Sequence, residues 1–149
     1  MRAIIQRVSE ASVIISSIEK CSVKEGLLIL IGIEESDNDG DVLWLSGKIP
    51  DLRIFSDKKG LMNLSVRDIK GGIIVVSQFT LHASTKKGNR PSFIRAAKPD
   101  KAEAVYSNFL AALKREFDDV KSGEFGADMK VHLVNDGPVT IFIDTKNKE

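Results

Sequence analysis

The sequence has few of the residues from which common active sites are built. It contains one cysteine, Cys21, and two histidines, His82 and His132, which stand far apart in the chain. A single cysteine excludes an internal disulfide and is typical of a protein from a reducing compartment. Metal sites need clustered cysteine, histidine and carboxylate ligands, so we expect neither a bound metal nor another cofactor.

Several other signals are missing as well. Neither the GxGxxG pattern nor the P-loop pattern occurs, so no phosphate-binding loop of these kinds is expected. No apolar run approaches the roughly 18 residues that span a bilayer, and the N-terminus MRAIIQRVSE lacks the apolar stretch of a signal peptide. The net charge is +1, so no global field attracts nucleic acid. We therefore expect a cytoplasmic protein without membrane or DNA partners, in which any RNA contact is local.

The remaining composition is that of an ordinary globular protein, and we treat residues 1–149 as a single domain. The apolar patterns predict strands in the first thirty-odd residues and at Leu52 to Phe55, Leu61 to Leu64, Ile73 to Ser77, Lys121 to Phe125, Met129 to Val134 and Val139 to Asp144. Helices are predicted from Asp37 to Ile49, before Pro50, and from Pro99 or Asp100 to about Asp118. Strands dominate, which predicts an α+β fold: a mainly antiparallel, barrel-like sheet with two principal helices.

The segment SQFTL, Ser77 to Leu81, carries three polar side chains directly after the apolar run GIIVV. A Ser-His-Asp triad is not predicted here, because His82 lies five residues beyond Ser77 and would face the other side of a strand. The chain thus has polar loops suited to a site but no conventional catalytic set. A reaction at this site must be an easy one, or the substrate must supply part of the chemistry.

A loop rich in basic residues follows this segment. Thr85 to Pro99 has no acidic residue, and it contains Lys86, Lys87, Arg90, Arg95, Lys98 and the aromatic Phe93. Considered alone, such a loop is usually a solvated surface. Its position just after SQFTL favours a role in binding phosphates and bases at the 3′ end of an RNA.

The segment NDGPVT, Asn135 to Thr140, places a Gly-Pro pair between the apolar runs MKVHLV and VTIFI. Such a pair commonly marks a turn between two strands. Glycine also lets the backbone approach a neighbour closely, and proline fixes its own φ, removes a donor and permits a cis peptide bond. Because the chain also contains SQFTL, a functional role for this pair competes with the turn interpretation.

Together, SQFTLHA, KKGNRPSF, GEFGADM, NDGPVT and the opening MRAIIQRV resemble the D-aminoacyl-tRNA deacylase family over essentially the whole chain. The resemblance implies a hydrolase that cleaves the ester between a D-amino acid and the terminal ribose of tRNA. It implies a homodimer in which a cis Gly137–Pro138 pair enters the neighbouring subunit's site, with Arg7 and Asn135 in supporting roles. The catalytic segment would be Ser77, Gln78, Phe79 and Thr80, and the tRNA-binding residues would be Lys86, Lys87, Arg90, Phe93 and Arg95.

Physical reasoning adds three hypotheses to this resemblance. Backbone N–H groups near Phe79 and Thr80 would form an oxyanion hole. The terminal 2′-hydroxyl of the RNA would assist hydrolysis, which we rank above Thr80 as nucleophile because no base is evident beside Thr80. Gly137–Pro138 would exclude L-amino acids as a rigid wall, so that glycyl-tRNA is accepted. The rival functions are an RNA-binding module without catalysis and a hydrolase of small D-amino acid esters or peptides that uses Thr80.

Overall fold

The computed structural model describes residues 1–148. Their elements follow one another along the chain as β1 (Arg2–Ile15), β2 (Ile18–Val23), β3 (Gly26–Gly32), α1 (Asp39–Lys48), η1 (Ile49–Asp51), β4 (Phe55–Ser56), β5 (Met62–Leu64), β6 (Gly72–Ser77), η2 (Phe79–His82), α2 (Pro99–Glu116), β7 (Val120–Ser122) and β8 (Met129–Asp144), where η marks a short 3₁₀-helix. No helix among these residues is long and apolar enough to cross a membrane.

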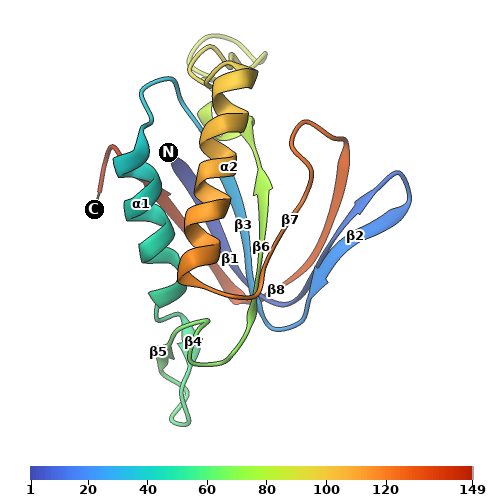
Figure 1. Ribbon diagram of the computed structural model, residues 1–149, viewed down its shortest axis with the longest axis vertical. Helices are drawn as coiled ribbons and strands as arrows, with labels where there is room; N and C mark the ends of the chain where they lie inside the picture. The colour runs from blue at the N-terminus through green and yellow to red at the C-terminus, as the bar shows by residue number, and fades with distance from the viewer. Residues whose placement is uncertain (149) are drawn as a thin grey trace.

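The fold is a curved, barrel-like sheet with both α-helices against one of its faces (Figure 1). The strand order is β2-β1-β3-β6-β7, and β8 pairs with β1 as well. The sheet is mixed, which corrects the expectation of a mainly antiparallel one. β1 is antiparallel to β2, β3 and β8, whereas β6 is parallel to both β3 and β7. The parallel pairs arise because the chain crosses over through α1 between β3 and β6, and through α2 between β6 and β7.

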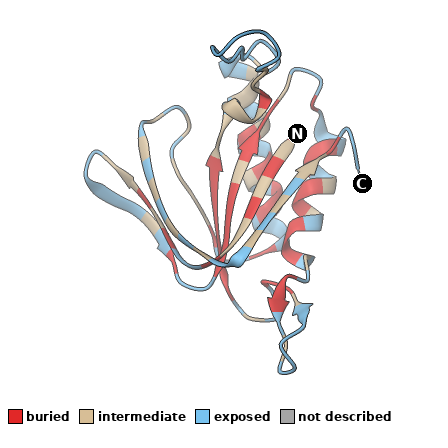
Figure 2. Cartoon of the chain, turned by 180° about the vertical axis from the view of Figure 1, so that it is seen from behind, coloured by how far each residue is buried: buried red, intermediate tan, exposed pale blue. Residues whose placement is uncertain are grey.

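The central strands are buried on both faces, which explains why β3 reads as an almost continuous apolar run (Figure 2). Successive side chains of a strand point to opposite faces. Leu27, Ile29 and Ile31 therefore join the core beneath the two helices. Leu28 joins a second cluster on the other side of the sheet, with Val8 and Ile74 among its members.

Both predicted helices are confirmed, and their ends have local causes. Asn38 caps α1 in a capping box with Asp41, and Pro50 lies in the 3₁₀ turn that follows the helix. Pro99 is the first residue of α2. Phe109 and Leu113 of α2 are fully buried, so this face of the helix packs in the core.

The strand predictions need three corrections. β8 is continuous from Met129 to Asp144, so NDGPVT is not a turn that separates two strands. Its pairing with β1 is irregular between Gln6 and Glu10, which absorbs the Gly-Pro pair inside the strand. β4 is only Phe55–Ser56, so it begins at the last residue of the predicted strand Leu52 to Phe55. β7 is Val120–Ser122, so backbone pairing ends three residues before Phe125.

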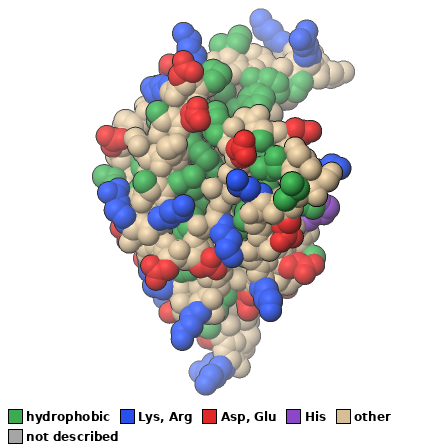
Figure 3. Space-filling model, turned by 45° about the vertical axis from the view of Figure 1, so that its right-hand side comes forward, with side chains coloured by type: hydrophobic (Ala, Val, Ile, Leu, Met, Phe, Trp, Pro, Cys, Tyr) green, Lys and Arg blue, Asp and Glu red, His purple; other side chains and the backbone are tan. Residues whose placement is uncertain are grey.

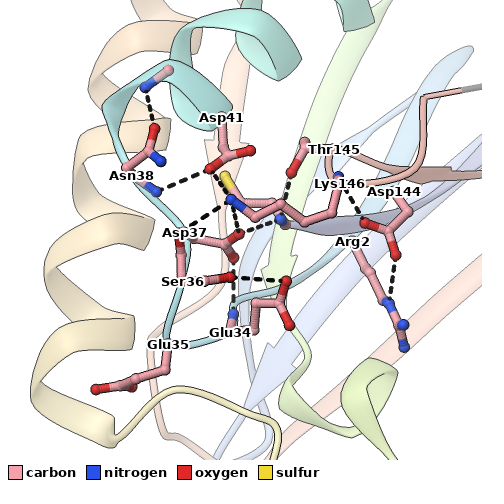
Figure 4. A network of polar contacts seen from close by, with 12 residues as sticks. Arg2, Glu34, Glu35, Ser36, Asp37, Asn38, Asp41, Asp144, Thr145 and Lys146 are labelled. Atoms are coloured by element: carbon pink, nitrogen blue, oxygen red, sulfur yellow. Dashed lines mark hydrogen bonds and ion pairs between the residues drawn. The ribbon is translucent and has the colours of Figure 1, made fainter.

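A buried polar network ties both ends of the chain to the loop before α1 (Figure 4). The α-amino group of Met1 donates to Asp37 at 2.5 Å and to Thr145 at 2.6 Å. Lys146 reaches Asp41 at 2.6 Å. Burial by itself would raise the pKa of Asp41, but hydrogen bonds from Lys146 and Thr145 outweigh it and lower that pKa to about 2. Asp41 is therefore charged at neutral pH, as a partner of Lys146 requires.

The parallel pair β3–β6 begins where two glycine backbones meet, and this contact generates a stability prediction. Gly26 lies opposite Gly72, and a Cβ on Gly26 would stand 2.0 Å from the Gly72 carbonyl oxygen. The backbones of β3 and β6 are hydrogen-bonded to each other and cannot move apart to make room for a methyl group. Gly26→Ala is therefore expected to lower the free energy of unfolding by roughly 1–3 kcal/mol in urea titrations. The control is Gly47→Ala in α1, where a Cβ meets nothing within 4 Å. It should raise stability by about 0.5–1 kcal/mol, and equal effects of the two changes would contradict this account.

Candidate active site

The segment from Ser77 to Thr80 lies where the central strand β6 ends. Ser77 is the last residue of β6 and pairs with Ile31 of β3. The N–H of Gln78 donates to the Ile31 carbonyl at 2.7 Å, and the chain then turns into η2. Sheet pairing therefore fixes this polar segment at the edge of the core.

Beyond the exposed ring of Phe79, the segment offers backbone amides and the polar side chains of Ser77, Gln78 and Thr80. Phe79 and Thr80 are the first two residues of η2, so their N–H groups have no acceptor within that helix. The Oγ1 of Thr80 accepts a hydrogen bond from Nε2 of Gln78 at 2.5 Å. An amide nitrogen cannot take a proton from a hydroxyl, so Gln78 is no general base.

His82 does not supply the missing base. It lies in η2 and not on a strand, its side chain is 1% exposed, and neither ring nitrogen has a hydrogen-bond partner among residues 1–148. Burial lowers the pKa of His82, which favours the neutral ring. The other histidine, His132, is exposed on β8. The described residues also contain no group of three His, Cys, Asp or Glu side chains that could hold a metal ion.

An apolar cavity of about 520 Å³ opens beside this segment. Its polar side chains are Ser77 and Gln78, and its other lining residues are Ile31, Ile33, Phe79, Phe93, Ala96, Ala97, Pro99, Ala102, Phe125 and Gly126. A larger, charged groove of about 840 Å³ lies elsewhere and contains none of the predicted site residues. We assign the site to the smaller cavity, because a mostly apolar wall with a few convergent polar groups is typical of a ligand site.

The basic loop stands over this cavity. Two backbone hydrogen bonds between Ser84 and Ser92 close the loop, at 2.8 and 2.9 Å. The ring of Phe93 meets that of Phe79 edge to face at 5.1 Å. The predicted RNA-binding side chains are all exposed: Lys86, Lys87, Arg90, Phe93 and Arg95. In the space-filling view, basic side chains at the top of the molecule flank an apolar area (Figure 3).

The Gly137–Pro138 pair is exposed and its peptide bond is cis, as the resemblance implied. Arg7 contacts the residue before it: Nε lies 3.0 Å from the Asp136 carbonyl oxygen and 3.4 Å from the Asp136 carboxylate. The same guanidinium donates to the Ile54 carbonyl at 2.7 Å. Arg7 thereby ties the pair to the segment before β4.

Asn135 closes the segment from the other side. Its Oδ1 accepts from the Val139 N–H at 3.0 Å, and its Nδ2 donates to Oγ1 of Thr140 at 2.8 Å. Gly137 has a φ of +128°, and a Cβ there would stand 2.8 Å from both Arg7 and Val139. This position therefore requires glycine.

Within one chain, the segment Ser77 to Thr80 and the segment Asn135 to Thr140 lie apart. Arg7 of β1 lies opposite Leu27 of β3, and Leu27 lies opposite Ile73 of β6. Arg7 is therefore level with Ile73, which precedes Ser77 by four residues along β6. At about 3.3 Å per residue this is roughly 13 Å along the strands. The cavity beside Ser77 is lined by no residue from Asn135 to Thr140.

Sequence reasoning missed several contacts that shape these regions. Arg2 donates to the Leu81 carbonyl of η2 at 2.9 Å, and Ile54 supplies a carbonyl to Arg7. Phe125 forms part of the cavity wall. Arg2 and Phe125 lie in the quoted motifs MRAIIQRV and GEFGADM, but their contacts join residues far apart in sequence, so only the folded chain shows them.

Comparisons with known proteins agree with the motifs. A family model described as D-Tyr-tRNA(Tyr) deacylase matches residues 4–144. Proteins named D-aminoacyl-tRNA deacylase are 61% identical in Flavobacterium psychrophilum and 59% identical in Flavobacterium johnsoniae, in each case over 100% of both chains.

Solved structures also match this fold. One is titled c-Myc DNA Unwinding Element Binding Protein, with a TM-score of 0.92 and 39% identity over 97% of this chain and 98% of that one. Another, titled as a probable eukaryotic D-amino acid tRNA deacylase, has a TM-score of 0.79 at 17% identity, over 95% of this chain and 97% of that one, and shows the shared fold alone. On the family model and the full-length relatives, this chain belongs to the D-Tyr-tRNA(Tyr) deacylase family.

Proposed function

We propose that this protein hydrolyses the ester bond of D-aminoacyl-tRNA in the cytoplasm, releasing a free D-amino acid and tRNA. One observation carries the proposal. Phe79, which lines an apolar cavity beneath a loop of exposed basic side chains, and the next residue, Thr80, both have backbone amides without helical acceptors. The full-length relatives named D-aminoacyl-tRNA deacylase support the same substrate class.

The substrate's two chemical parts match the two parts of the site. The basic side chains of the loop, Lys86, Lys87, Arg90 and Arg95, would neutralise phosphates near the 3′ end of the RNA. Phe93 offers an exposed ring on which a base can stack. The cavity below takes the aminoacylated end, so that the ester carbonyl lies beside Phe79 and Thr80.

The mechanism needs little from the side chains, because an aminoacyl ester is already an activated acyl group. Water attacks the carbonyl, and the N–H groups of Phe79 and Thr80 stabilise the oxyanion that forms. Loss of one such donor costs about 3–4 kcal/mol in other enzymes. The hydroxyl oxygen of Thr80 accepts a hydrogen bond from Gln78 and has no base beside it, which argues against Thr80 as the nucleophile. The 2′-hydroxyl of the terminal ribose, next to the ester, assists the attack instead.

Selectivity for the D-enantiomer would come from exclusion. Gly137 and Pro138 offer no functional side chain, and Arg7 and Asn135 hold the neighbouring backbone from two sides. A backbone fixed in this way excludes any substrate side chain that points toward it, whatever the identity of the amino acid. Since this pair lies away from the cavity of its own chain, we propose that it acts on the cavity of a second subunit in a homodimer.

The proposed activity predicts a defined order of substrates. Purified protein should deacylate D-Tyr-tRNA at least 10-fold faster than L-Tyr-tRNA, and glycyl-tRNA should also be cleaved because glycine has no side chain to exclude. The measurement is release of radiolabelled amino acid at neutral pH against a no-enzyme control. Salt-sensitive tRNA binding without cleavage would instead identify an RNA-binding module, and wholly inert glycyl-tRNA would contradict selection by exclusion.

The roles of Thr80 and the RNA hydroxyl can be separated with two changes. Thr80→Val removes the hydroxyl but keeps the backbone amide, and kcat should stay within about 10-fold of the unchanged protein. A D-aminoacyl-tRNA that ends in 2′-deoxyadenosine should lose about 10²-fold or more, as expected when a positioned proton-transfer group is removed. The opposite pattern would establish Thr80 as the nucleophile.

A site shared between subunits predicts complementation. Pro138→Ala alone should relax the preference for D-Tyr-tRNA, and Ser77→Phe should block the cavity. After subunit exchange with excess Ser77→Phe chains, each Pro138→Ala chain pairs with a subunit that carries an intact Pro138. The ratio of D-Tyr-tRNA to L-Tyr-tRNA deacylation should then rise at least 10-fold above that of the Pro138→Ala protein alone. Excess chains carrying both changes are the matched control and should restore nothing. Equal results from the two mixtures would place the whole site in one chain.

A further inference from the structure

The turn η2, which carries the Phe79 and Thr80 amides, accepts a hydrogen bond from an arginine near the N-terminus of the chain. Nη1 of Arg2 donates to the Leu81 carbonyl at 2.9 Å, and Nε of the same guanidinium donates to Oδ2 of Asp144 at 3.0 Å. Arg2 opens β1, and Asp144 ends β8. The Arg2 guanidinium thus joins the end of the β1–β8 pair to η2.

Asp144 orients this guanidinium. It lies directly opposite Arg2 in the antiparallel pair β1–β8, and its Oδ1 accepts from the Lys146 N–H at 3.0 Å (Figure 4). Burial by itself would raise the pKa of Asp144, but hydrogen bonds from the Lys146 backbone and from Arg2 lower it. Asp144 is therefore an anion whose two oxygens are both occupied, and a guanidinium bound to it has little freedom to turn.

The backbone of η2 has few other hydrogen bonds from side chains. Among residues 1–148, Arg2 is the one side chain that donates to a backbone carbonyl of Phe79–His82. The inner surface of the turn packs against Gly32, where a Cβ would stand 2.9 Å from Cβ of Leu81 and 3.1 Å from the ring of His82. His82 is buried there without a hydrogen bond from its ring, so it packs but does not anchor.

We propose that Arg2, held by Asp144, is a positioning residue for the deacylation reaction. It touches neither the cavity nor any reacting atom. It sets the orientation of η2 and thereby aims the two amides at the ester oxygen, where a small rotation weakens a hydrogen bond to the developing oxyanion. The reaction it serves is the proposed function, whereas its contact with Leu81 stands without it.

The first test is kinetic. Arg2→Gln and Asp144→Asn should each lower kcat for D-Tyr-tRNA at least 10-fold while KM changes less than about 3-fold, since the basic loop is untouched. The double variant should fall no further than Arg2→Gln, because the two residues act as a unit. The control is Arg67→Gln: Arg67 likewise pairs with a carboxylate, Asp51, and donates to a backbone carbonyl, that of Glu116, but away from η2. An equal loss in the control, or additive losses in the pair, would overturn the proposal.

The second test does not depend on activity. In ¹H–¹⁵N spectra, the amide signals of Phe79 and Thr80 should shift in Arg2→Gln and in Asp144→Asn and stay in place in Arg67→Gln. Unchanged signals in the first two variants would overturn the positioning role whatever the kinetics show. If the unchanged protein cleaves no D-aminoacyl-tRNA but these shifts occur, the proposed function fails and the Arg2 contact with η2 is upheld.

Discussion

The structure depends on the pairing of β1 along both of its edges. β8 follows one edge from Arg2 to Ile15, and the other edge is shared between β3, up to Val8, and β2 beyond it. A strand bonded in this way cannot slide without breaking three ladders and moving its buried side chains to the wrong face. The two arginines of β1, Arg2 and Arg7, are therefore held at fixed heights on the sheet.

Those two positions on β1 correspond to the two regions proposed to be functional. Arg2 contacts η2 beside the cavity, and Arg7 contacts the backbone next to Gly137–Pro138. Five residues of extended strand separate them, so they cannot serve one site within one chain. The proposed dimer resolves this separation, because a second copy can place its Gly-Pro pair at the first copy's cavity. The length of β1 between Arg2 and Arg7 therefore sets the distance between the proposed catalytic region and the proposed selectivity region.

Sequence patterns predicted local elements well and pairings less well. The helices followed from apolar spacing, the capping residue Asn38 and the two prolines near their ends. The mixed sheet was missed because strand direction depends on whether a connection crosses over, which no strand's own residues record. The continuous β8 was missed because Gly-Pro usually interrupts a ladder, whereas here an irregular register with β1 accommodates it.

The candidate site divides in the same way. Ser77 to Thr80, the exposed basic loop and the Gly-Pro pair could all be read from the sequence, because each is a contiguous segment whose residue types carry its chemistry. The sequence alone thus determined the family, the candidate residues and the two helices. Only the tertiary structure decided that the cavity lies beside Ser77, that Arg2 and Arg7 brace separate regions, and that Gly137–Pro138 stands apart from its own chain's cavity. These facts join residues distant in sequence, and the register and curvature of the whole sheet bring such residues together.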